Sequence, residues 1–453
     1  MNIIIAGDGK VGSTLTRMLS AEGHDVTLID SNAQVLDHSL ERYDVMAVQG
    51  NCAAMEVLNQ AGISEAELLI AVTNADEINL LCCTTAHALN PKLHTIARIR
   101  NPQYLDQIYR MRDVFGLSLV INPENQAARE IDGLLKYPGF LRRDNFAKGR
   151  TEIVELRIQP GSKLCNVSLI DLPGVVKCKV LVCAVLRDGQ ALVTNSGSFT
   201  LREGDRVFVT APTRNLTTLL KNLGLLTRRV RGVMICGGGR VSYYLASLLE
   251  KSGISVRLIE QNPDRCRELA ALLPGSHIIH GDGTDQSLLE SEGLGEADAL
   301  ISLTGLDEMN MIISLYGQSR GVGQVITKLS RMENRTMIDA LSLGSVVCPK
   351  ELCCNTIARY VRAMGNQSGA AVSVHAIADG QAEAVEFLVD ETTKYCGVPL
   401  TDIKMRPDVL LASITRGAHV EIPSGSSTFQ VGDTVVLVTG RLGTIRQLND
   451  IFA

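Results

Sequence analysis

Two matching segments of the chain indicate its fold. Residues 2–12 read NIIIAGDGKVG, and residues 232–242 read GVMICGGGRVS. In both copies an apolar, β-branched run leads directly into closely spaced glycines. A buried strand followed by a glycine turn and a helix begins a Rossmann-type nucleotide-binding unit. The duplication therefore predicts two such units in one chain.

The repeat extends far beyond these two segments. AVTNADEIN at 71–79 matches SLTGLDEMN at 302–310 with an offset of 231 residues, and SGSFTLREGDRVFV at 196–209 matches SGSSTFQVGDTVVL at 424–437 with an offset of 228. A repeat that runs through the whole chain predicts that its two halves have the same fold. One half is thus a longer unit followed by a shorter one, and the second half repeats the pair.

The longer units alternate short apolar runs with helix-length segments. The first contains the runs IIIA, VTLID, VMAV, ELLIAV, TIARI and LSLVIN. This order predicts an α/β fold, namely a Rossmann-like doubly wound parallel sheet with helices on both faces. A proline-led helix is expected after each sixth strand, from Pro123 and from Pro349.

The shorter units alternate apolar and polar residues, carry Gly-Asp turns and show little helix, which is typical of small α+β modules. Linkers are expected at 144–150, 227–231 and 365–369. The predicted division is a Rossmann domain at 1–123, a linking helix and linker at 124–150, a small module at 151–226, a Rossmann domain at 231–348, a linking helix and linker at 349–369, and a small module at 370–453.

Composition excludes several classes of protein. The 453 residues are 45% hydrophobic and 21% charged, with a net charge of 44 − 49 = −5. There is no basic field for nucleic acid.

We expect no signal peptide and no membrane-spanning run, because the chain enters a glycine loop at once and has no apolar stretch of about 18 residues. The twelve cysteines form no CxxC pair, so we expect reduced thiols in a cytoplasmic protein and no metal site.

The first glycine loop has the residues that a dinucleotide requires. Gly7 makes the tight turn, Gly9 lets backbone amides approach a pyrophosphate, and Gly12 lets the helix pack on the strand. Asp30 ends the second strand 18 residues after Gly12, where a carboxylate binds ribose hydroxyls and disfavours a 2′-phosphate. NAD(H) or an adenosine nucleotide is therefore favoured over NADP, and a ligand-free glycine turn is the alternative. The loop is completed by Asp8, Lys10 and Val11.

The second loop is a looser match. Ser242 replaces the third glycine, and Glu260 again follows 18 residues later. A second nucleotide site and a structural Rossmann remnant both remain open. The loop residues assigned to the candidate site are Gly237, Gly238, Gly239, Arg240 and Val241.

Further polar residues are expected at the carboxyl ends of the strands, where ligands of such sheets lie. Thr73 and Asn74 end the fourth strand, and Thr304 takes the same place in the second half. Arg98 in the fifth strand is a candidate phosphate partner, with Lys328 in its place in the second half; an ordinary interface or surface charge is the alternative. Asp282, which corresponds to Asn51, is expected in the wall of an adenine pocket. Asp76-Glu77 and Asp307-Glu308 are expected to be helix-start charges.

The sequence contains few of the residue patterns that catalysis requires. The chain has no nucleophile elbow, no Walker A lysine, and no histidine that recurs in a chemically meaningful pair. Two nucleotide folds without catalytic or metal-binding residues indicate a sensor rather than an enzyme.

Over its whole length the sequence resembles the TrkA family, the peripheral regulatory subunits of Trk-type bacterial potassium uptake systems. The resemblance rests on GDGKVG with Asp30, on AVTNADEINLL, on ARIRNPQY at 97–104, and on the doubled order of an RCK (KTN) N-type domain followed by an RCK C-type domain.

This resemblance implies a regulatory subunit that docks on the cytoplasmic face of a membrane potassium translocator and gates uptake. It implies binding of NAD(H) and of ATP or ADP by the glycine-loop residues named above, and a homo-oligomeric ring built from a dimer or tetramer of chains. The competing classes are a nicotinamide-dependent oxidoreductase and a redox-sensing regulator of another channel or of transcription. For the last of these, the sequence lacks a helix-turn-helix candidate.

Overall fold

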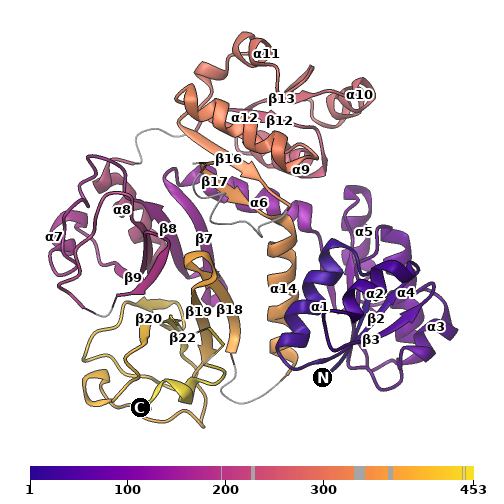
Figure 1. The fold of residues 1–453 in the computed structure, drawn as a ribbon, viewed down its shortest axis with the longest axis horizontal. Helices are drawn as coiled ribbons and strands as arrows, with labels where there is room; N and C mark the ends of the chain where they lie inside the picture. Colours follow the sequence, from indigo (N-terminus) through magenta and orange to yellow (C-terminus); the bar gives the residue numbers. More distant parts are fainter. Residues whose placement is uncertain are drawn as a thin grey trace. The chain divides into compact units, whose positions relative to one another are not determined.

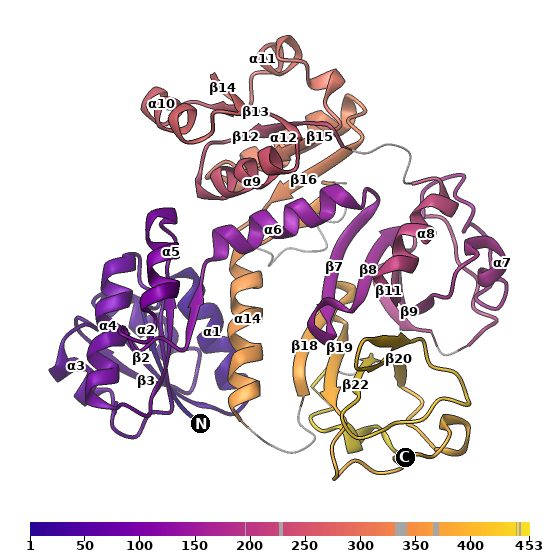
Figure 2. The ribbon, with the colours of Figure 1, turned by 180° about the vertical axis from the view of Figure 1, so that it is seen from behind.

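The computed structural model describes residues 1–194, 196–225, 230–330, 341, 343–365, 371–440, 442–443 and 445–453. They form two compact units. The first comprises residues 1–127 and 348–360, and the second comprises residues 128–347 and 361–453. Figures 1 and 2 show the ribbon with its helices and strands labelled.

The first unit is built on a six-stranded sheet with the strand order β3-β2-β1-β4-β5-β6. All neighbouring strands run parallel, and the six predicted strands are confirmed. Their bounds are β1 Asn2–Ala6, β2 Asp25–Asp30, β3 Met46–Gln49, β4 Leu68–Ala71, β5 His94–Arg98 and β6 Leu119–Ile121. The chain reverses direction across the sheet between β1 and β4, which is the switch point where such sheets bind ligands.

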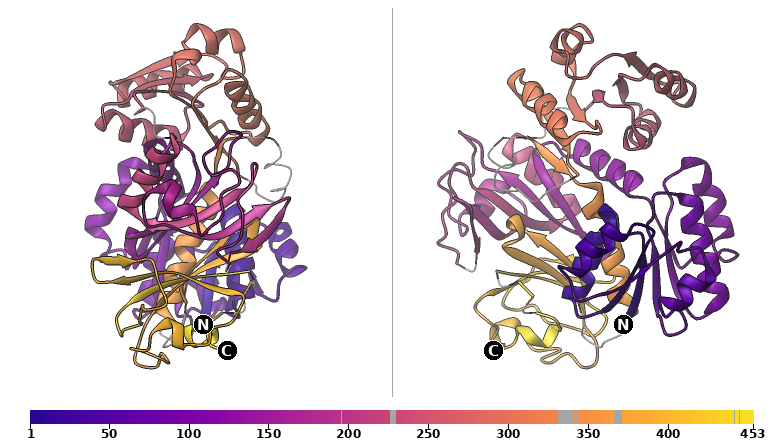
Figure 3. Two further views of the ribbon diagram at one scale, coloured as in Figure 1. Left: turned by 90° about the vertical axis from the view of Figure 1, so that its left-hand side faces the viewer. Right: turned by 45° about the vertical axis from the view of Figure 1, so that its right-hand side comes forward.

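Helices cover this sheet on both faces (Figure 3), so its central strands are buried. β4 has four buried residues in a row, as a strand covered on both faces requires. The helices are α1 Lys10–Ala21, α2 Ala33–Leu40, α3 Met55–Gln60, α4 Asp76–Leu89 and α5 Pro102–Met111, and α6 Pro123–Lys136 begins in this unit and continues into the second.

The first unit also contains most of α14 (Pro349–Met364), the helix that follows the second sheet in sequence. Tyr360 on α14 shares a hydrogen bond of 2.7 Å with the His94 ring, and the Cys354 thiol lies 3.8 Å from the Val11 carbonyl oxygen. Both predicted proline-led helices are present. The sequence did not indicate that the helix from Pro349 packs on the first Rossmann sheet.

The second unit contains the other Rossmann sheet, with the order β14-β13-β12-β15-β16-β17 and parallel pairing throughout. Its strands are β12 Gly232–Cys236, β13 Ser255–Glu260, β14 Ser276–His280, β15 Ala299–Ser302, β16 Gln324–Lys328 and β17 Ser345–Val347. Its helical segments are α9 Arg240–Lys251, α10 Pro263–Leu272, α11 Gln286–Ser291, η2 Leu294–Glu296 and α12 Asp307–Ser319.

Two five-stranded antiparallel sheets complete this unit. The first has the order β10-β9-β11-β8-β7, and the second β18-β19-β22-β20-β21. The first module contains β7 Phe140–Phe146, η1 Ala147–Gly149, β8 Thr151–Arg157, α7 Leu172–Val176, β9 Leu181–Arg187, β10 Gln190–Val193, β11 Arg206–Pro212 and α8 Thr213–Leu223. The second contains β18 Ala371–Ile377, η3 Ala378–Gly380, β19 Ala382–Leu388, η4 Leu400–Asp402, β20 Val409–Arg416, β21 His419–Glu421, β22 Thr434–Thr439 and η5 Leu448–Ile451.

The prediction of a linker at 144–150 is wrong. Residues 140–146 form the edge strand β7, which pairs antiparallel with β8, and a 3-10 turn joins the two. Phe140, Asp144 and Phe146 of β7 are buried, and the two phenylalanines pack in hydrophobic clusters with other strands. Most of the linkers expected at 227–231 and 365–369 lies outside the described residues.

One hydrophobic cluster joins the two antiparallel modules. Phe146, Ile153 and Phe208 of the first pack in the same cluster as Ile377 and Val436 of the second. An ion pair of 2.8 Å between Arg206 and Asp379 also joins them.

Among the described residues, no helix is long and apolar enough to cross a membrane.

Candidate nucleotide-binding sites

The first glycine loop connects β1 to α1 and fits the predicted roles of its glycines. Gly7 has a φ of +97°, and a Cβ there would lie 2.8 Å from the Thr73 backbone nitrogen. A Cβ at Gly12 would lie 1.9 Å from the Gly7 carbonyl oxygen, so only glycine lets α1 begin this close to the loop. These two glycines are required by the protein's own packing.

Gly9 differs from them, because a Cβ there would meet nothing within 4 Å. The loop is therefore open on the side where a ligand would approach. Gly9 is the N-cap of α1, and no side chain in the described part of the chain caps this helix. Uncapped N–H groups at the positive end of a helix are suited to phosphate oxygens. Lys10 is exposed beside them, whereas Val11 is buried and offers only its backbone.

Asp30 lies at the end of β2, directly beside this loop. Its Oδ2 accepts a hydrogen bond from the Asp8 backbone N–H at 2.8 Å, and its Oδ1 accepts one from the Asn32 N–H at 2.9 Å. A carboxylate oxygen can accept more than one hydrogen bond, so both oxygens keep capacity for ribose hydroxyls. The residue expected to bind the ribose thus also fixes the phosphate loop.

The Asp8 side chain does not face the open side of the loop. It is 2% exposed, and its Oδ2 accepts a hydrogen bond from the Ser39 hydroxyl of α2 at 2.5 Å. Its Oδ1 has no partner among the described residues. Burial raises the pKa of Asp8, and the neighbouring Asp30 charge acts in the same direction. Asp8 therefore contributes a backbone amide to the candidate site, while its carboxyl group braces the loop against α2.

The second loop repeats the main contacts. Gly237 has a φ of +102°, and a Cβ at Gly239 would again meet nothing within 4 Å. Glu260 accepts hydrogen bonds from the Gly238 N–H at 2.6 Å and the Asn262 N–H at 2.7 Å, as Asp30 does in the first half. The Ser242 hydroxyl, buried where Gly12 stands in the first half, donates to the Gly237 carbonyl. The serine thus makes a hydrogen bond at the helix–loop contact. Arg240 and Val241 begin α9.

The two loops also differ at the second of their six residues. Gly238 stands where the first half has Asp8, and a Cβ on Gly238 would lie 2.7 Å from Leu269 of α10. Leu269 in turn corresponds to Ser39. The polar Asp8–Ser39 pair is therefore replaced by a glycine and a leucine. Arg265 of α10 adds a further contact by donating from Nε to the Gly238 carbonyl at 2.8 Å.

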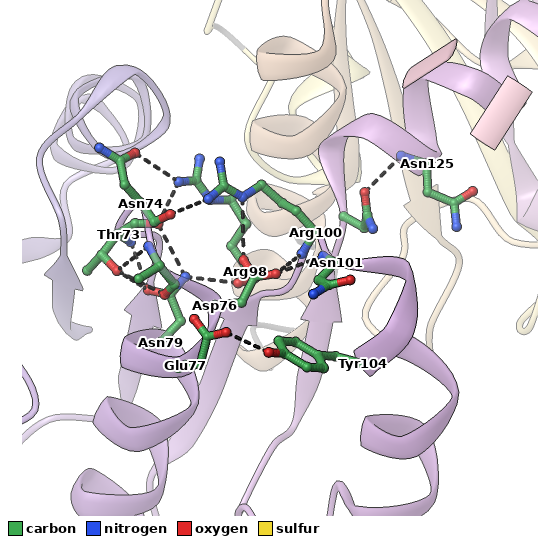
Figure 4. Close-up of polar contacts among 12 residues, drawn as sticks. Thr73, Asn74, Asp76, Glu77, Asn79, Arg98, Arg100, Asn101, Tyr104 and Asn125 are labelled. Atoms are coloured by element: carbon green, nitrogen blue, oxygen red, sulfur yellow. Dashed lines mark hydrogen bonds and ion pairs between the residues drawn. The ribbon is translucent and has the colours of Figure 1, made fainter. Parts of the chain in front are cut away.

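Thr73 and Asn74 belong to a hydrogen-bonded network at the carboxyl ends of β4 and β5 (Figure 4). The Asn79 side chain is its centre. Its Oδ1 accepts from the Thr73 N–H at 2.8 Å and the Thr73 hydroxyl at 2.7 Å, and its Nδ2 donates to the Arg98 carbonyl at 2.9 Å. Asn310 makes the same contacts with Thr304 and with the Lys328 carbonyl in the second half. Thr73 and Thr304 are thus fixed by the protein itself.

Arg98 places a buried cation beside this network. It is 8% exposed, and its Nη2 donates to the Thr73 carbonyl at 2.6 Å. Its Nε has no hydrogen-bond partner in the described part of the chain. Burial lowers the pKa of Arg98, and the charge of Arg100 lowers it further. Two neighbouring guanidinium groups of like charge are stabilised by an anion, so the pair is suited to a phosphate.

Arg100 also tethers the loop after β5 to α4. It forms an ion pair with Asp76, which also accepts hydrogen bonds from the Arg100 N–H at 2.8 Å and the Asn101 N–H at 2.7 Å. Asp307 accepts from the Ser330 N–H in the same way. Both aspartates lie in the first turn of their helices, as expected.

Asn51 and Asp282, which follow the third strand of each Rossmann sheet, form hydrogen bonds within their own loops. The Asn51 amide oxygen accepts from the Ala53 N–H at 3.0 Å, and Asp282 accepts from the Thr284 N–H at 2.9 Å and its hydroxyl at 2.8 Å. The hydrogen bonds from Thr284 lower the pKa of Asp282. Lys328 donates from Nζ to the Leu303 carbonyl at 3.4 Å, one residue before Thr304, whereas Arg98 donates to the carbonyl of Thr73 itself in the first half.

The sequence patterns did not predict that Asn79, Asn310, Arg100 and Arg265 take part in the candidate sites. A signal for the two asparagines was present, because the matched segments AVTNADEIN and SLTGLDEMN both end in asparagine. Nothing local distinguishes Arg265 from other surface arginines. Among the described residues, no cluster of His, Cys, Asp or Glu could hold a metal ion.

Two open glycine loops on Rossmann sheets, each with a carboxylate at the end of the second strand, define a protein with two Rossmann-type units in tandem. The TrkA-N domain family matches residues 3–123 and 233–349, and the TrkA-C domain family matches residues 153–224 and 384–453. The chain belongs to the TrkA family. Among its relatives are a Trk system potassium uptake protein TrkA homolog of Archaeoglobus fulgidus, 32% identical over all of both chains, and the TrkA protein of Haemophilus influenzae, 29% identical over 100% of this chain and 98% of the other.

Solved structures share the fold at low sequence identity. The GsuK channel bound to NAD aligns with a TM-score of 0.60 at 16% identity, covering 97% of this chain and 76% of that one. GsuK bound to ADP aligns with a TM-score of 0.51 at 15% identity, over 80% and 69%. The human SLO3 gating ring aligns with a TM-score of 0.51 at 12% identity, over 97% and 99%.

Proposed function

We propose that this chain is the nucleotide-sensing regulatory subunit of a potassium uptake system. In this proposal it binds NAD(H), ATP or ADP at the first glycine loop and at the matching second loop. It docks on the cytoplasmic face of a membrane potassium translocator and gates uptake according to the nucleotide bound. The observation that carries the proposal is the paired geometry of Asp30 and Glu260, each of which braces an open, uncapped phosphate loop.

The geometry of both loops supports nucleotide binding. An anionic pyrophosphate would lie on the N-terminal amides of α1 beside Gly9, with the ribose on Asp30. Arg98, linked to Gly7 through Thr73, would face the phosphates from the other side. The structures with this fold include the GsuK channel bound to NAD and GsuK bound to ADP, which supports these two ligand classes.

The membrane partner is supported by the names of the relatives, which are Trk system potassium uptake proteins over the full length of the match. We infer a peripheral location at the cytoplasmic face and a ring of chains, a dimer or a tetramer, because the fold also occurs in a gating ring. The domain division belongs to this proposal, with RCK N-type domains at 1–123 and 231–348 and C-type modules at 151–226 and 370–453, the first module being extended at its start by β7.

Regulation requires that the nucleotides differ in their affinity for two arrangements of the domains. The phosphate contacts on Arg98 and Arg100 provide such a difference, because NADH, ADP and ATP place different negative charge there. We infer that this charge, and no chemical step at the nicotinamide ring, is the signal. The alternative of a nicotinamide-dependent oxidoreductase predicts turnover of NADH with a carbonyl substrate, which this account does not.

The proposal is tested first by nucleotide binding to the full chain. Titration calorimetry with NADH, ATP and ADP would be run on the native chain, on Asp30→Asn, on Glu260→Gln and on the double variant. We expect each single variant to lose roughly tenfold or more in affinity at one site, because one hydrogen bond to a charged group is worth about 1.5–3 kcal/mol. The double variant should lose both sites.

Asp37→Asn is the matched control, because Asp37 is exposed on α2 and its substitution changes the net charge by the same amount. Affinity unchanged in all three site variants, with the native chain binding normally, would refute the assignment of both loops. Steady oxidation of NADH by the native chain in the presence of a panel of small carbonyl compounds would favour the enzyme alternative.

A further inference from the structure

Exposed cations gather around α7 and α8 of the first antiparallel module (Figure 1). They are Lys163, Lys177, Lys179, Arg214 and Lys221. The segments that carry them, residues 159–180 and 213–225, contain one acidic residue, Asp171, so their net charge is 5 − 1 = +4. The whole chain has a net charge of −5. Positive charge is therefore concentrated on this part of the surface, which we call the α7–α8 face.

Hydrogen bonds hold the two segments side by side. Asn222 of α8 donates from Nδ2 to the Val176 carbonyl at 2.6 Å. Asn215, one helical stretch earlier, donates from Nδ2 to the Lys179 carbonyl at 2.8 Å. Lys163 donates from Nζ to the Asn222 carbonyl at 2.8 Å, and its ammonium group keeps two further N–H donors. Because these contacts tie the chain before and after α7 to both ends of α8, the five cations share one surface.

Local structure does not favour a cation at two of these positions. Lys177 ends α7 with a φ of +52°, a left-handed conformation that glycine or asparagine adopts at lower cost. Arg214 lies in the first turn of α8, which contains no acidic residue, although the positive end of a helix disfavours a cation. The stability of the two helices therefore does not account for either charge.

The second antiparallel module does not repeat this charge. Residues 151–226 have a net charge of 9 − 6 = +3, whereas residues 370–453 have a net charge of 6 − 10 = −4. In the second module, Arg406 forms an ion pair with Asp408 at 2.7 Å, so its charge is offset within the module. Since both modules are built on five antiparallel strands, the fold itself does not require a positive face.

The composition of the α7–α8 face favours a lipid surface over a nucleic acid. Four of its five cations are lysines, whose ammonium groups act as point charges toward dispersed anions. Its two segments contain no aromatic residue on which a base could stack. Ile170, two residues before α7, is 74% exposed. An exposed isoleucine beside cations is suited to the boundary between lipid headgroups and acyl chains.

We propose that the α7–α8 face binds the headgroups of anionic phospholipids at a membrane surface. The phosphate groups of such a surface offset the like charges that the five cations place beside one another. This lipid contact is additional to the docking on a translocator proposed above. It depends neither on the translocator nor on a bound nucleotide.

The test is flotation of the full-length chain with protein-free vesicles, made either of phosphatidylcholine alone or of phosphatidylcholine with one-third phosphatidylglycerol. Each mixture would be run at about 0.1 M and about 1 M salt, since the Debye length falls from about 10 Å to about 3 Å over this range. We expect the native chain to bind the phosphatidylglycerol vesicles at the lower salt concentration and to leave them at the higher one. It should not bind vesicles of phosphatidylcholine alone.

The Lys177→Asn/Arg214→Gln variant removes two charges from the α7–α8 face. Each lysine or arginine near an anionic surface strengthens binding roughly fivefold, so we expect the variant to bind at least about tenfold more weakly. Its free energy of unfolding should not fall, because asparagine suits the left-handed position and the first turn of α8 loses an unfavourable charge. The matched control is Lys394→Gln/Lys404→Gln, which removes two exposed lysines from the second module and should bind as the native chain does.

The proposal is overturned if the native chain does not float with the phosphatidylglycerol vesicles at the lower salt concentration, or if the Lys177→Asn/Arg214→Gln variant binds them as tightly as the control. Binding of a single-stranded oligonucleotide in place of the vesicles, lost in the same variant, would assign the face to nucleic acid instead. Because the vesicles contain no translocator and no nucleotide is added, either failure would leave the proposed regulatory function standing.

Discussion

The Asp30 carboxylate accepts a hydrogen bond from the backbone N–H of Asp8, with 2.8 Å between the two atoms. Glu260 repeats this contact with Gly238 at 2.6 Å. In each half, the group expected to bind the ribose therefore also holds the loop expected to bind the phosphates. Under the proposed binding mode, a change in either carboxylate should affect the contacts of both the ribose and the phosphates.

Two glycines of the first loop should have different roles, one in nucleotide affinity and the other in the stability of the fold. Gly9→Ala should change the free energy of unfolding by less than about 1 kcal/mol, because its Cβ would meet no protein atom within 4 Å. It should nevertheless lower nucleotide affinity at the first site roughly tenfold or more, because the methyl group occupies the open face of the loop. Gly12→Ala should instead cost roughly 3 kcal/mol, since its Cβ would lie 1.9 Å from a carbonyl oxygen.

Urea unfolding and nucleotide titration on the same two preparations check this prediction. If Gly9→Ala binds nucleotide as well as the native chain, the open face of the loop is not where the phosphates lie.

Asn79 should be essential for the order of the strand ends in the first half. Asn79→Ala removes the acceptor for the Thr73 N–H and hydroxyl and the donor to the Arg98 carbonyl. Buried groups left without partners cost about 1–3 kcal/mol each, so we expect destabilisation of roughly 3 kcal/mol. Urea unfolding measures it, with Asn59→Ala on the exposed face of α3 as the matched control. A loss no larger than that of the control would show that the network does not hold the strand ends.

The stability of the second unit should depend on pH through Glu130 of α6. Burial raises the pKa of Glu130 to about 7, and the Asp144 charge adds to this effect. Between its ordinary pKa near 4.5 and pH 7 the folded state keeps the proton, whereas the unfolded state releases it. The contribution to stability is therefore complete below the ordinary pKa and falls as the pH rises toward 7.

Glu130→Gln mimics the protonated form and should flatten this fall, so the variant should be more stable than the native chain at pH 8. Glu203→Gln, at an exposed acid of the same unit, should leave the pH dependence unchanged. Urea unfolding between pH 5 and pH 8, followed in parallel for the three proteins, gives the result. Parallel curves for Glu130→Gln and the native chain would contradict the prediction.

Much of the fold was accessible from the sequence because the signals are local and repeated. Buried strands, glycine turns and proline-led helices each depend on a few neighbouring residues, and the duplication showed each signal twice. The strand β7 was missed because Asp144 and Asn145 resemble turn residues. Its burial depends on Asp144 meeting His375 of the other module at 3.0 Å, a contact between residues 231 positions apart.

The candidate sites could be predicted only where a motif carries the chemistry. Gly7, Asp30 and Glu260 follow from spacing, and the structure places them where the spacing requires. The inward orientation of Asp8 could not be foreseen, because it depends on Ser39 of the next helix, and Leu269 closes the same space in the second half. The packing of α14 on the first sheet likewise depends on contacts between distant residues.

Nucleotide-dependent gating is tested most directly by rubidium uptake into membrane vesicles that contain the Trk-type translocator and have been stripped of soluble protein. Purified chain would be added with no nucleotide, NADH, ATP or ADP, alongside the Asp30→Asn/Glu260→Gln double variant and the Asp37→Asn control. We predict that uptake depends on the native chain and differs between nucleotides, that the control behaves likewise, and that the double variant supports uptake without nucleotide dependence. Equal uptake with every nucleotide, by a chain that binds them, would contradict the account.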